Sequence, residues 1–220
     1  MNSIAVLGGT GQQGRGLAQR FAHAGARVVI GSRDPERARA VVAGWRAAVQ
    51  PIEVAHNALA VEQCETCVLA VPFMSVDALL DELRPCFGSG RVVIDVTVPV
   101  TFDGGKMAMS EVAEGSASEH IRARLPLTVG LAAAFKTVPG RLLAEVGVPL
   151  DCDEFVCGDS DDVRSRARAV VELLPGLRAV DVGPLSRARS IEHLTALAIA
   201  INRRHRIHDA RFRVVGLGTP

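Results

Sequence analysis

The first residues that could do chemistry form a glycine-rich segment, Gly9-Thr10-Gly11-Gln12-Gln13-Gly14, which matches the pattern G-x-G-x-x-G. It follows an apolar run at residues 3–7 and opens a stretch with helical spacing of apolar residues. In dinucleotide-binding folds the first glycine permits a tight turn, the second lets the backbone approach a pyrophosphate, and the third lets helix pack on strand. The free N–H groups at the helix N-terminus then face the phosphates. We therefore predict a dinucleotide site, with a merely tight strand–helix turn as the alternative.

The end of the second expected strand decides which dinucleotide fits. An NAD site places Asp or Glu there to accept from the ribose 2′-hydroxyl, whereas this chain has Gly31-Ser32-Arg33. A hydroxyl followed by a guanidinium can bind a 2′-phosphate, which a carboxylate would repel. Thr10 and Arg37 are placed to add a second hydroxyl and a second positive charge, although Arg37 could equally be an ordinary exposed helix residue beside Glu36. The sequence therefore favours NADP over NAD.

Two further strand ends carry residues of interest. Val71-Pro72-Phe73 follows the fourth expected strand, and a doubly wound sheet holds its ligand at the carboxyl ends of the strands beside the switch point. Pro72 and Phe73 either border the cofactor or make a rigid turn in which Phe73 fills core space. Asp95, at the next strand end, is either catalytic or, as we favour, a carboxylate that caps nearby backbone N–H groups.

Only a parallel sheet would bring these strand ends together, and the hydrophobic pattern predicts one. Strands are expected at residues 3–7, 27–31, 52–55, 67–71, 91–96, 127–131, 154–157 and 178–182. Helices are expected at residues 16–24, 34–49, 57–63, 75–84, 139–146, 161–174 and 185–206. The alternation predicts an α/β fold, a doubly wound, mostly parallel Rossmann-type sheet with a small C-terminal helical extension. Residues 102–106 are expected to form a glycine-bearing loop, which could act as a mobile lid.

The composition argues against several classes of protein. Of the 220 residues, 48% are hydrophobic and 22% charged, which suits one compact core. The formal net charge of +1 and the scarcity of aromatic residues argue against nucleic acid as a partner. We expect a cytoplasmic protein without a membrane segment, because no basic leader and no long apolar run is present. The five cysteines, including Cys64-Glu65-Thr66-Cys67, lack the spacing of a disulfide framework or a zinc site, so no metal is expected.

Motifs along nearly the whole chain resemble those of the NADPH-dependent reductases of coenzyme F420, which is a deazaflavin. The similarity rests on Gly8-Gly9-Thr10-Gly11-Gln12-Gln13-Gly14, Gly31-Ser32-Arg33, Val71-Pro72-Phe73, Thr137-Val138-Pro139, Val156-Cys157-Gly158-Asp159, and Gly183-Pro184-Leu185-Ser186 followed by Glu192-x-Leu194-Thr195. The glycine segment alone would suit many dehydrogenases. The two C-terminal elements in this order are much more specific to this family.

The resemblance implies an oxidoreductase that moves a hydride between NADP(H) and coenzyme F420. Residues 1–182 would form the NADP-binding domain, and residues 183–220 a helical segment that closes the acceptor site. Val138 would be part of the wall behind two stacked rings. Lys136 stands where family members commonly have histidine, and His193 where they have a small serine. Both are therefore candidate polar contacts to the deazaflavin.

These two departures leave alternatives open for the acceptor. The chain could reduce a flavin, a metal complex, an imine or a carbonyl with NADPH, or it could be a non-enzymatic regulator that senses NADP. The expected helix at residues 185–206 carries apolar residues on more than one stripe. Because closed two-fold dimers are the commonest soluble assemblies, we also expect a homodimer.

Overall fold

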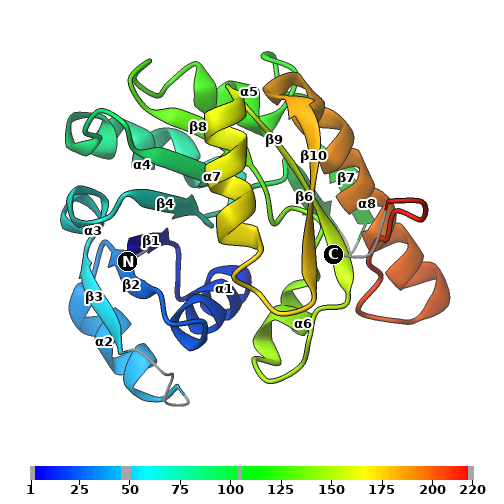
Figure 1. Ribbon diagram of the computed structural model, residues 1–220, viewed down its shortest axis with the longest axis horizontal. Coiled ribbons are helices and arrows are strands. Elements are labelled where there is room, and N and C mark those ends of the chain that lie inside the picture. Colours follow the sequence, from blue (N-terminus) through cyan, green and yellow to red (C-terminus); the bar gives the residue numbers. More distant parts are fainter. Residues whose placement is uncertain (1–2, 46–50, 104–105, 218–220) are drawn as a thin grey trace.

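A single large sheet forms the centre of the protein. The computed structural model describes residues 3–45, 51–103 and 106–217. Eight strands lie in the order β10-β9-β8-β5-β4-β1-β2-β3 (Figure 1). Their bounds are β1 Ser3–Leu7, β2 Arg27–Ser32, β3 Ile52–His56, β4 Thr66–Leu69, β5 Val92–Asp95, β8 Gly130–Ala133, β9 Cys152–Gly158 and β10 Leu177–Pro184. Every neighbouring pair is parallel except β8 and β9, so the expected mostly parallel sheet is confirmed.

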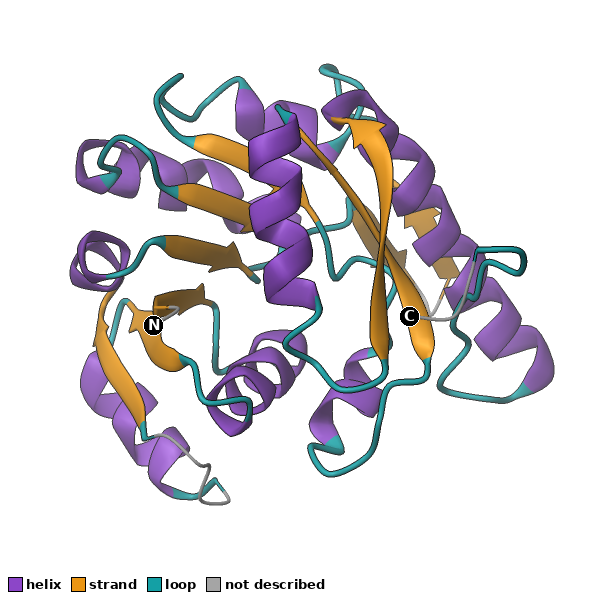
Figure 2. Cartoon of the chain, viewed as in Figure 1, coloured by secondary structure: helices purple, strands orange, loops and turns teal. Residues whose placement is uncertain are grey.

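Helices cover both faces of this sheet, as a doubly wound fold requires. They are α1 Gln12–His23, α2 Pro35–Ala43, α3 Asn57–Gln63, α4 Val76–Leu83, α5 Ala117–Arg122, α6 Gly140–Ala144, α7 Asp161–Val171 and α8 Ala188–His205. One core cluster joins the strands to α1, α6 and α7, and a second joins their other face to α3, α4 and α5. Figure 2 shows α7 crossing in front of the strands. No helix in the described ranges has both the length and the apolar character to cross a bilayer.

Three expectations need correction. Instead of a loop at residues 102–106, β6 (Val100–Asp103) pairs antiparallel with β7 (Lys106–Met109), and residues 104–105 lie outside the described ranges. Phe102 pairs with Met107 across this hairpin, an apolar match that a loop prediction overlooks. The helix expected to run to residue 49 ends at Ala43, before Gly44, and residues 46–50 are not described. The strand expected at 127–131 lies later, in β8.

One buried arginine fixes the short helix α6 against α1. The guanidinium of Arg20 donates to the carbonyl oxygens of Leu142, Leu143, Glu145 and Val148, at 2.7–2.9 Å. At Gly16 a Cβ atom would lie 2.6 Å from the Cβ of Leu143, so only glycine permits this approach of the two helices. Helix α6 and the residues that follow it are therefore held against α1.

Candidate functional site

The glycine-rich turn lies between β1 and α1, beside the end of β4. The strand order reverses at this place, because β1 continues through α1 to β2 on one side while β4 and β5 lie on the other. Gly8 has a φ of 80°, and a Cβ there would lie 2.6 Å from the carbonyl oxygen of Ala70. A Cβ at Gly14 would lie 2.4 Å from the carbonyl oxygen of Gly8. Glycines thus allow the two strand ends and the start of α1 to meet.

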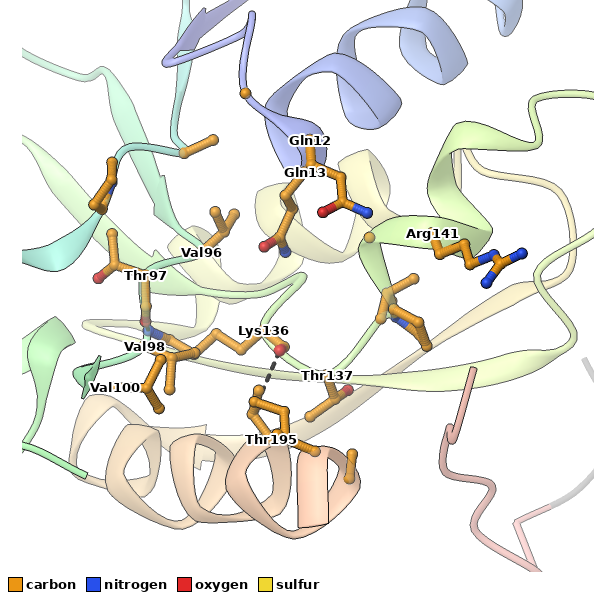
Figure 3. A pocket seen from close by; sticks show the side chains of 18 of the residues that line it. Gln12, Gln13, Val96, Thr97, Val98, Val100, Lys136, Thr137, Arg141 and Thr195 are labelled. Carbon is orange, nitrogen blue, oxygen red and sulfur yellow. Dashed lines mark hydrogen bonds between the residues drawn. The ribbon is translucent and has the colours of Figure 1, made fainter. Parts of the chain in front are cut away.

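A cavity of about 780 Å³ opens at this point, a volume suited to a coenzyme-sized ligand. Its walls come from the start of α1, the ends of β4 and β5, β6, residues 136–141, and α8 with the segment after it. Figure 3 shows Gln12 and Gln13 on one side and Thr195 of α8 on the opposite side. Among the described residues that line it there is no aspartate or glutamate, whereas Arg141 and His208 are present. The cavity therefore suits anionic ligands.

The structure brings together about half of the residues that the sequence singled out. Gly11, Gln12, Gln13, Val71, Pro72, Phe73, Lys136 and Val138 all line the cavity. Gly9 and Gly14 are buried beneath the turn, where they permit close packing. The other four residues lie outside the cavity: Thr10 follows β1, Ser32 ends β2, Arg33 follows Ser32, and Arg37 lies in the first turn of α2.

Arg33, in the turn after β2, and Arg37, in the first turn of α2, are both exposed. The Ser32 hydroxyl donates to the carbonyl of Asp34 at 3.0 Å and accepts from its N–H at 3.1 Å. The Asp34 carboxylate caps α2 by accepting from the N–H of Arg37 at 3.1 Å. Within the described ranges the side chains of Arg33 and Arg37 have no hydrogen-bond or ion-pair partner, so both guanidinium groups remain available for an anion.

His193, the second residue expected to contact the deazaflavin, lies apart from the large cavity that Lys136 lines. Its exposed ring borders a second hollow, of about 510 Å³, between the N-terminal part of α8 and the segment after β7. The ring Nδ1 lies 2.7 Å from the carbonyl oxygen of Arg189, one turn earlier in α8. Glu192 points into the protein interior. Because adjacent residues of a helix point in different directions, His193 points toward the surface.

Lys136 lines the cavity, but its ammonium group is paired with acceptors inside the protein. The fully buried ammonium donates to Asp95 Oδ2 at 2.7 Å, to Glu192 Oε1 at 3.2 Å and to the carbonyl of Thr97. Burial alone would lower the pKa of Lys136, but the two carboxylates raise it above its ordinary value. Burial raises the pKa of Glu192. The three side chains tie the end of β5 and α8 to the segment after β8.

Asp95 has the capping role that the sequence favoured. Its Oδ1 accepts from the N–H of Thr97 at 2.7 Å, and its Oδ2 accepts from the hydroxyl of Ser118 at 2.6 Å. The ion pair with Lys136 completes its set of partners. Because the carboxylate is fully buried and satisfied, its role is structural: it holds the segment after β5 beneath the cavity surface.

The segment that carries Lys136 is fixed from several sides, in part by Glu154, which the sequence analysis had not identified. Phe135 adopts a left-handed φ of 58°, and its carbonyl accepts from the Gln13 side chain at 2.5 Å. The buried Glu154 of β9 accepts from the N–H of Lys136 at 3.0 Å and the hydroxyl of Thr137 at 2.7 Å. Burial raises the pKa of Glu154 to about 7. A charged residue within an apolar strand was the signal that could have revealed Glu154.

The two cysteines of the C-x-x-C segment are packing residues. Cys64 and Cys67 are both buried around the start of β4. Burial raises the pKa of Cys64 to about 11 and that of Cys67 further. Neither thiol ionises readily near neutral pH, so neither takes part in the chemistry of the cavity.

Known proteins resemble this chain in sequence along nearly its full length. Residues 3–99 match the family described as NADP oxidoreductase, coenzyme F420-dependent. The chain is 38% identical to the F420-dependent NADP reductase of Methanothermobacter marburgensis, over 97% of the chain and 98% of that protein. It is 39% identical to the F420-dependent NADP reductase of Methanothermobacter thermautotrophicus, over 97% of the chain and 95% of that protein.

A solved structure shows a similar fold. The crystal structure of a proposed F420-dependent NADP reductase from Arthrobacter sp. has a TM-score of 0.79 and 24% sequence identity. The similarity covers 96% of this chain and 98% of that chain. The two chains therefore share their fold over nearly their whole length.

The buried Glu154 predicts a pH-dependent stability. Its pKa is about 7 in the folded protein and near 4.5 when unfolded, so rising pH removes the proton from the unfolded chain first. The unmodified protein should therefore lose stability relative to Glu154→Gln between pH 4.5 and 7, by up to about 1.4 kcal/mol per pH unit. Denaturant unfolding of both proteins across this range measures the difference, with Glu172→Gln at an exposed position as the control. A pH-independent difference would contradict the assignment.

Proposed function

The chain belongs to the family of coenzyme F420-dependent NADP oxidoreductases, and we propose on this basis that its cavity is where a hydride passes between NADP(H) and coenzyme F420. The observation that carries the proposal is one cavity that joins the glycine turn to the C-terminal helix. Nicotinamide and deazaflavin supply the redox chemistry when bound. The chain orients the two rings, excludes water and balances charge.

NADP(H) would extend across the carboxyl ends of β4, β1 and β2. The pyrophosphate would lie against the turn at Gly9, Gly11 and Gly14, facing the N–H groups of Gln12 and Gln13 at the start of α1. The 2′-phosphate would lie after β2, near Thr10, Ser32, Arg33 and Arg37, where guanidinium groups are free to pair with it.

The rings would occupy the more apolar part of the cavity. Val71, Pro72 and Phe73 form one wall there, and Val138 forms another. Apolar walls exclude water and leave the rings in contact, which favours a near-attack arrangement. Lys136 would act mainly by fixing the wall, since its ammonium already has three acceptors. His193 would not contact the rings in this arrangement.

The activity can be tested directly. NADPH and oxidised coenzyme F420 are mixed with purified protein, and the loss of deazaflavin absorbance is followed. We expect bleaching well above the uncatalysed background, because both rings are held in one cavity. A parallel titration confirms that NADPH binds. Bound NADPH without bleaching would contradict the proposed acceptor and leave the NADP site standing.

Arg33 provides a test of cofactor preference. A charge-assisted hydrogen bond contributes about 1.5–3 kcal/mol, so Arg33→Ala should raise the KM for NADPH by roughly 10- to 100-fold. The KM for NADH should hardly change, because NADH has no 2′-phosphate. Arg39→Ala removes a nearby arginine that pairs with Glu36 and serves as the control. Equal binding of NADPH and NADH by the unmodified protein would refute the assignment.

We also propose a two-domain organisation and a cytoplasmic homodimer. Residues 1–182 would bind NADP, and residues 183–220 would close the acceptor site.

The dimer is supported by exposed apolar side chains on α8 and in the segment after it, namely Leu197, Ile207, Val215 and Leu217. Covering such a surface is a common reason for association. Light scattering at micromolar concentration should give twice the chain mass of 23.3 kDa, and a value equal to that mass would refute the dimer.

A further inference from the structure

Thr97 holds an unpartnered hydroxyl in the wall of the cavity. The residue follows β5, lines the cavity and is only 3% exposed. Its N–H donates to Asp95 Oδ1 at 2.7 Å, and its carbonyl accepts from the ammonium of Lys136. Its Oγ1 is shielded from water and has no hydrogen-bond partner within the described ranges. The N–H and the carbonyl of Thr97 are thus each bonded to a buried charged side chain, whereas its hydroxyl has no partner among the described residues.

Packing alone does not explain a threonine at this position. A buried polar group without a partner costs about 1–3 kcal/mol. Valine has nearly the same shape without this cost, and Val96, Val98 and Val100 are the neighbouring side chains in the cavity wall. A ligand that supplies the missing partner would offset the cost.

The surroundings of Thr97 indicate the chemistry of that ligand. The ends of β4 and β5 contribute residues 70–73 and 96–98 to the cavity, and Thr97 is the only one of these with a polar side chain. An apolar surface with one hydroxyl suits a flat ring that presents a hydrogen-bonding group at its edge. Nicotinamide has a carboxamide, and a deazaflavin ring has amide-type C=O and N–H groups.

We infer that the Thr97 hydroxyl binds the amide edge of the ring held at the ends of β4 and β5. The identity of the ring rests on the proposed function. Rotation about the Cα–Cβ bond exchanges the methyl and the hydroxyl of threonine among staggered positions, so the oxygen can turn toward a bound ring. A hydroxyl both donates and accepts, so it can pair with either a C=O or an N–H group.

Lys136 and Asp95 would position Thr97 for this role. Each satisfies one backbone group of Thr97, and both side chains are fully buried. The backbone at Thr97 is therefore fixed, and rotation of the side chain is its main remaining freedom. This assigns the lysine that departs from the family pattern an indirect effect on the ring, through the residue that it holds.

The test compares Thr97→Val with Thr97→Ser, which keeps the hydroxyl. Calorimetric titrations give the Kd of NADPH and the Kd of oxidised coenzyme F420 for each purified protein, and thermal unfolding without ligand gives the melting temperature. We expect Thr97→Val to bind one of the two coenzymes roughly 3- to 10-fold more weakly, the effect of one lost hydrogen bond. Its melting temperature should equal or exceed that of the unmodified protein, because no internal hydrogen bond is lost.

The pattern of losses identifies the ring. A weaker Kd for NADPH alone assigns nicotinamide, and a weaker Kd for coenzyme F420 alone assigns the deazaflavin. Thr97→Ser should restore the affinity, and Thr128→Val, at an exposed position outside the cavity, should leave both Kd values unchanged. Unchanged affinities in Thr97→Val, or a lowered melting temperature that Thr97→Ser restores, would overturn the inference while the proposed function stands. If the unmodified protein bound neither coenzyme, both the inference and the proposed function would be overturned.

Discussion

The buried ion pair of Lys136 with Asp95 and Glu192 is the interaction on which the site depends. It joins three segments that are distant in the sequence: the end of β5, the segment after β8, and α8. Burying charges is costly unless each has well-placed partners, and removing one partner leaves the others uncompensated. Here the ammonium has three acceptors, and both carboxylates also accept from groups other than the lysine. The arrangement therefore holds α8 in one position over the sheet.

That position creates the cavity and sets its electrostatic character. The hydroxyl of Thr195 in α8 donates to the carbonyl of Lys136 at 2.9 Å, which adds a direct bond between the helix and the segment after β8 (Figure 3). Because Asp95 and Glu192 are paired below the surface, no carboxylate lines the cavity among the described residues. Anionic coenzymes in this cavity would therefore meet the N-terminus of α1 and Arg141 without opposing negative charge from the described lining residues. Closed walls and fixed dipoles are what a direct hydride transfer requires from a protein.

The sequence was most informative where the structure depends on local spacing. The glycine turn and the first five strands follow from apolar runs and from glycines at fixed separations, which act over a few residues. The hairpin of β6 and β7 was missed because glycines at 104 and 105 indicate a loop, whereas its stability comes from cross-strand pairs such as Phe102 with Met107. The role of Lys136 was missed because its partners lie 41 and 56 residues away in the sequence. Sequence spacing does not report such contacts, so a conspicuous lysine was predicted to face the ligand.

The central claim is that one cavity passes a hydride directly from nicotinamide to the deazaflavin. Two NADPH preparations, each carrying deuterium at one of the two positions of the transferable carbon, are incubated separately with the protein and oxidised coenzyme F420 in ordinary water. Mass spectrometry of the reduced coenzyme measures the transfer. Because a fixed cavity presents one face of the nicotinamide ring, we predict deuterium in the product from one preparation and none from the other. Reduced coenzyme that contains no deuterium from either preparation would contradict the account.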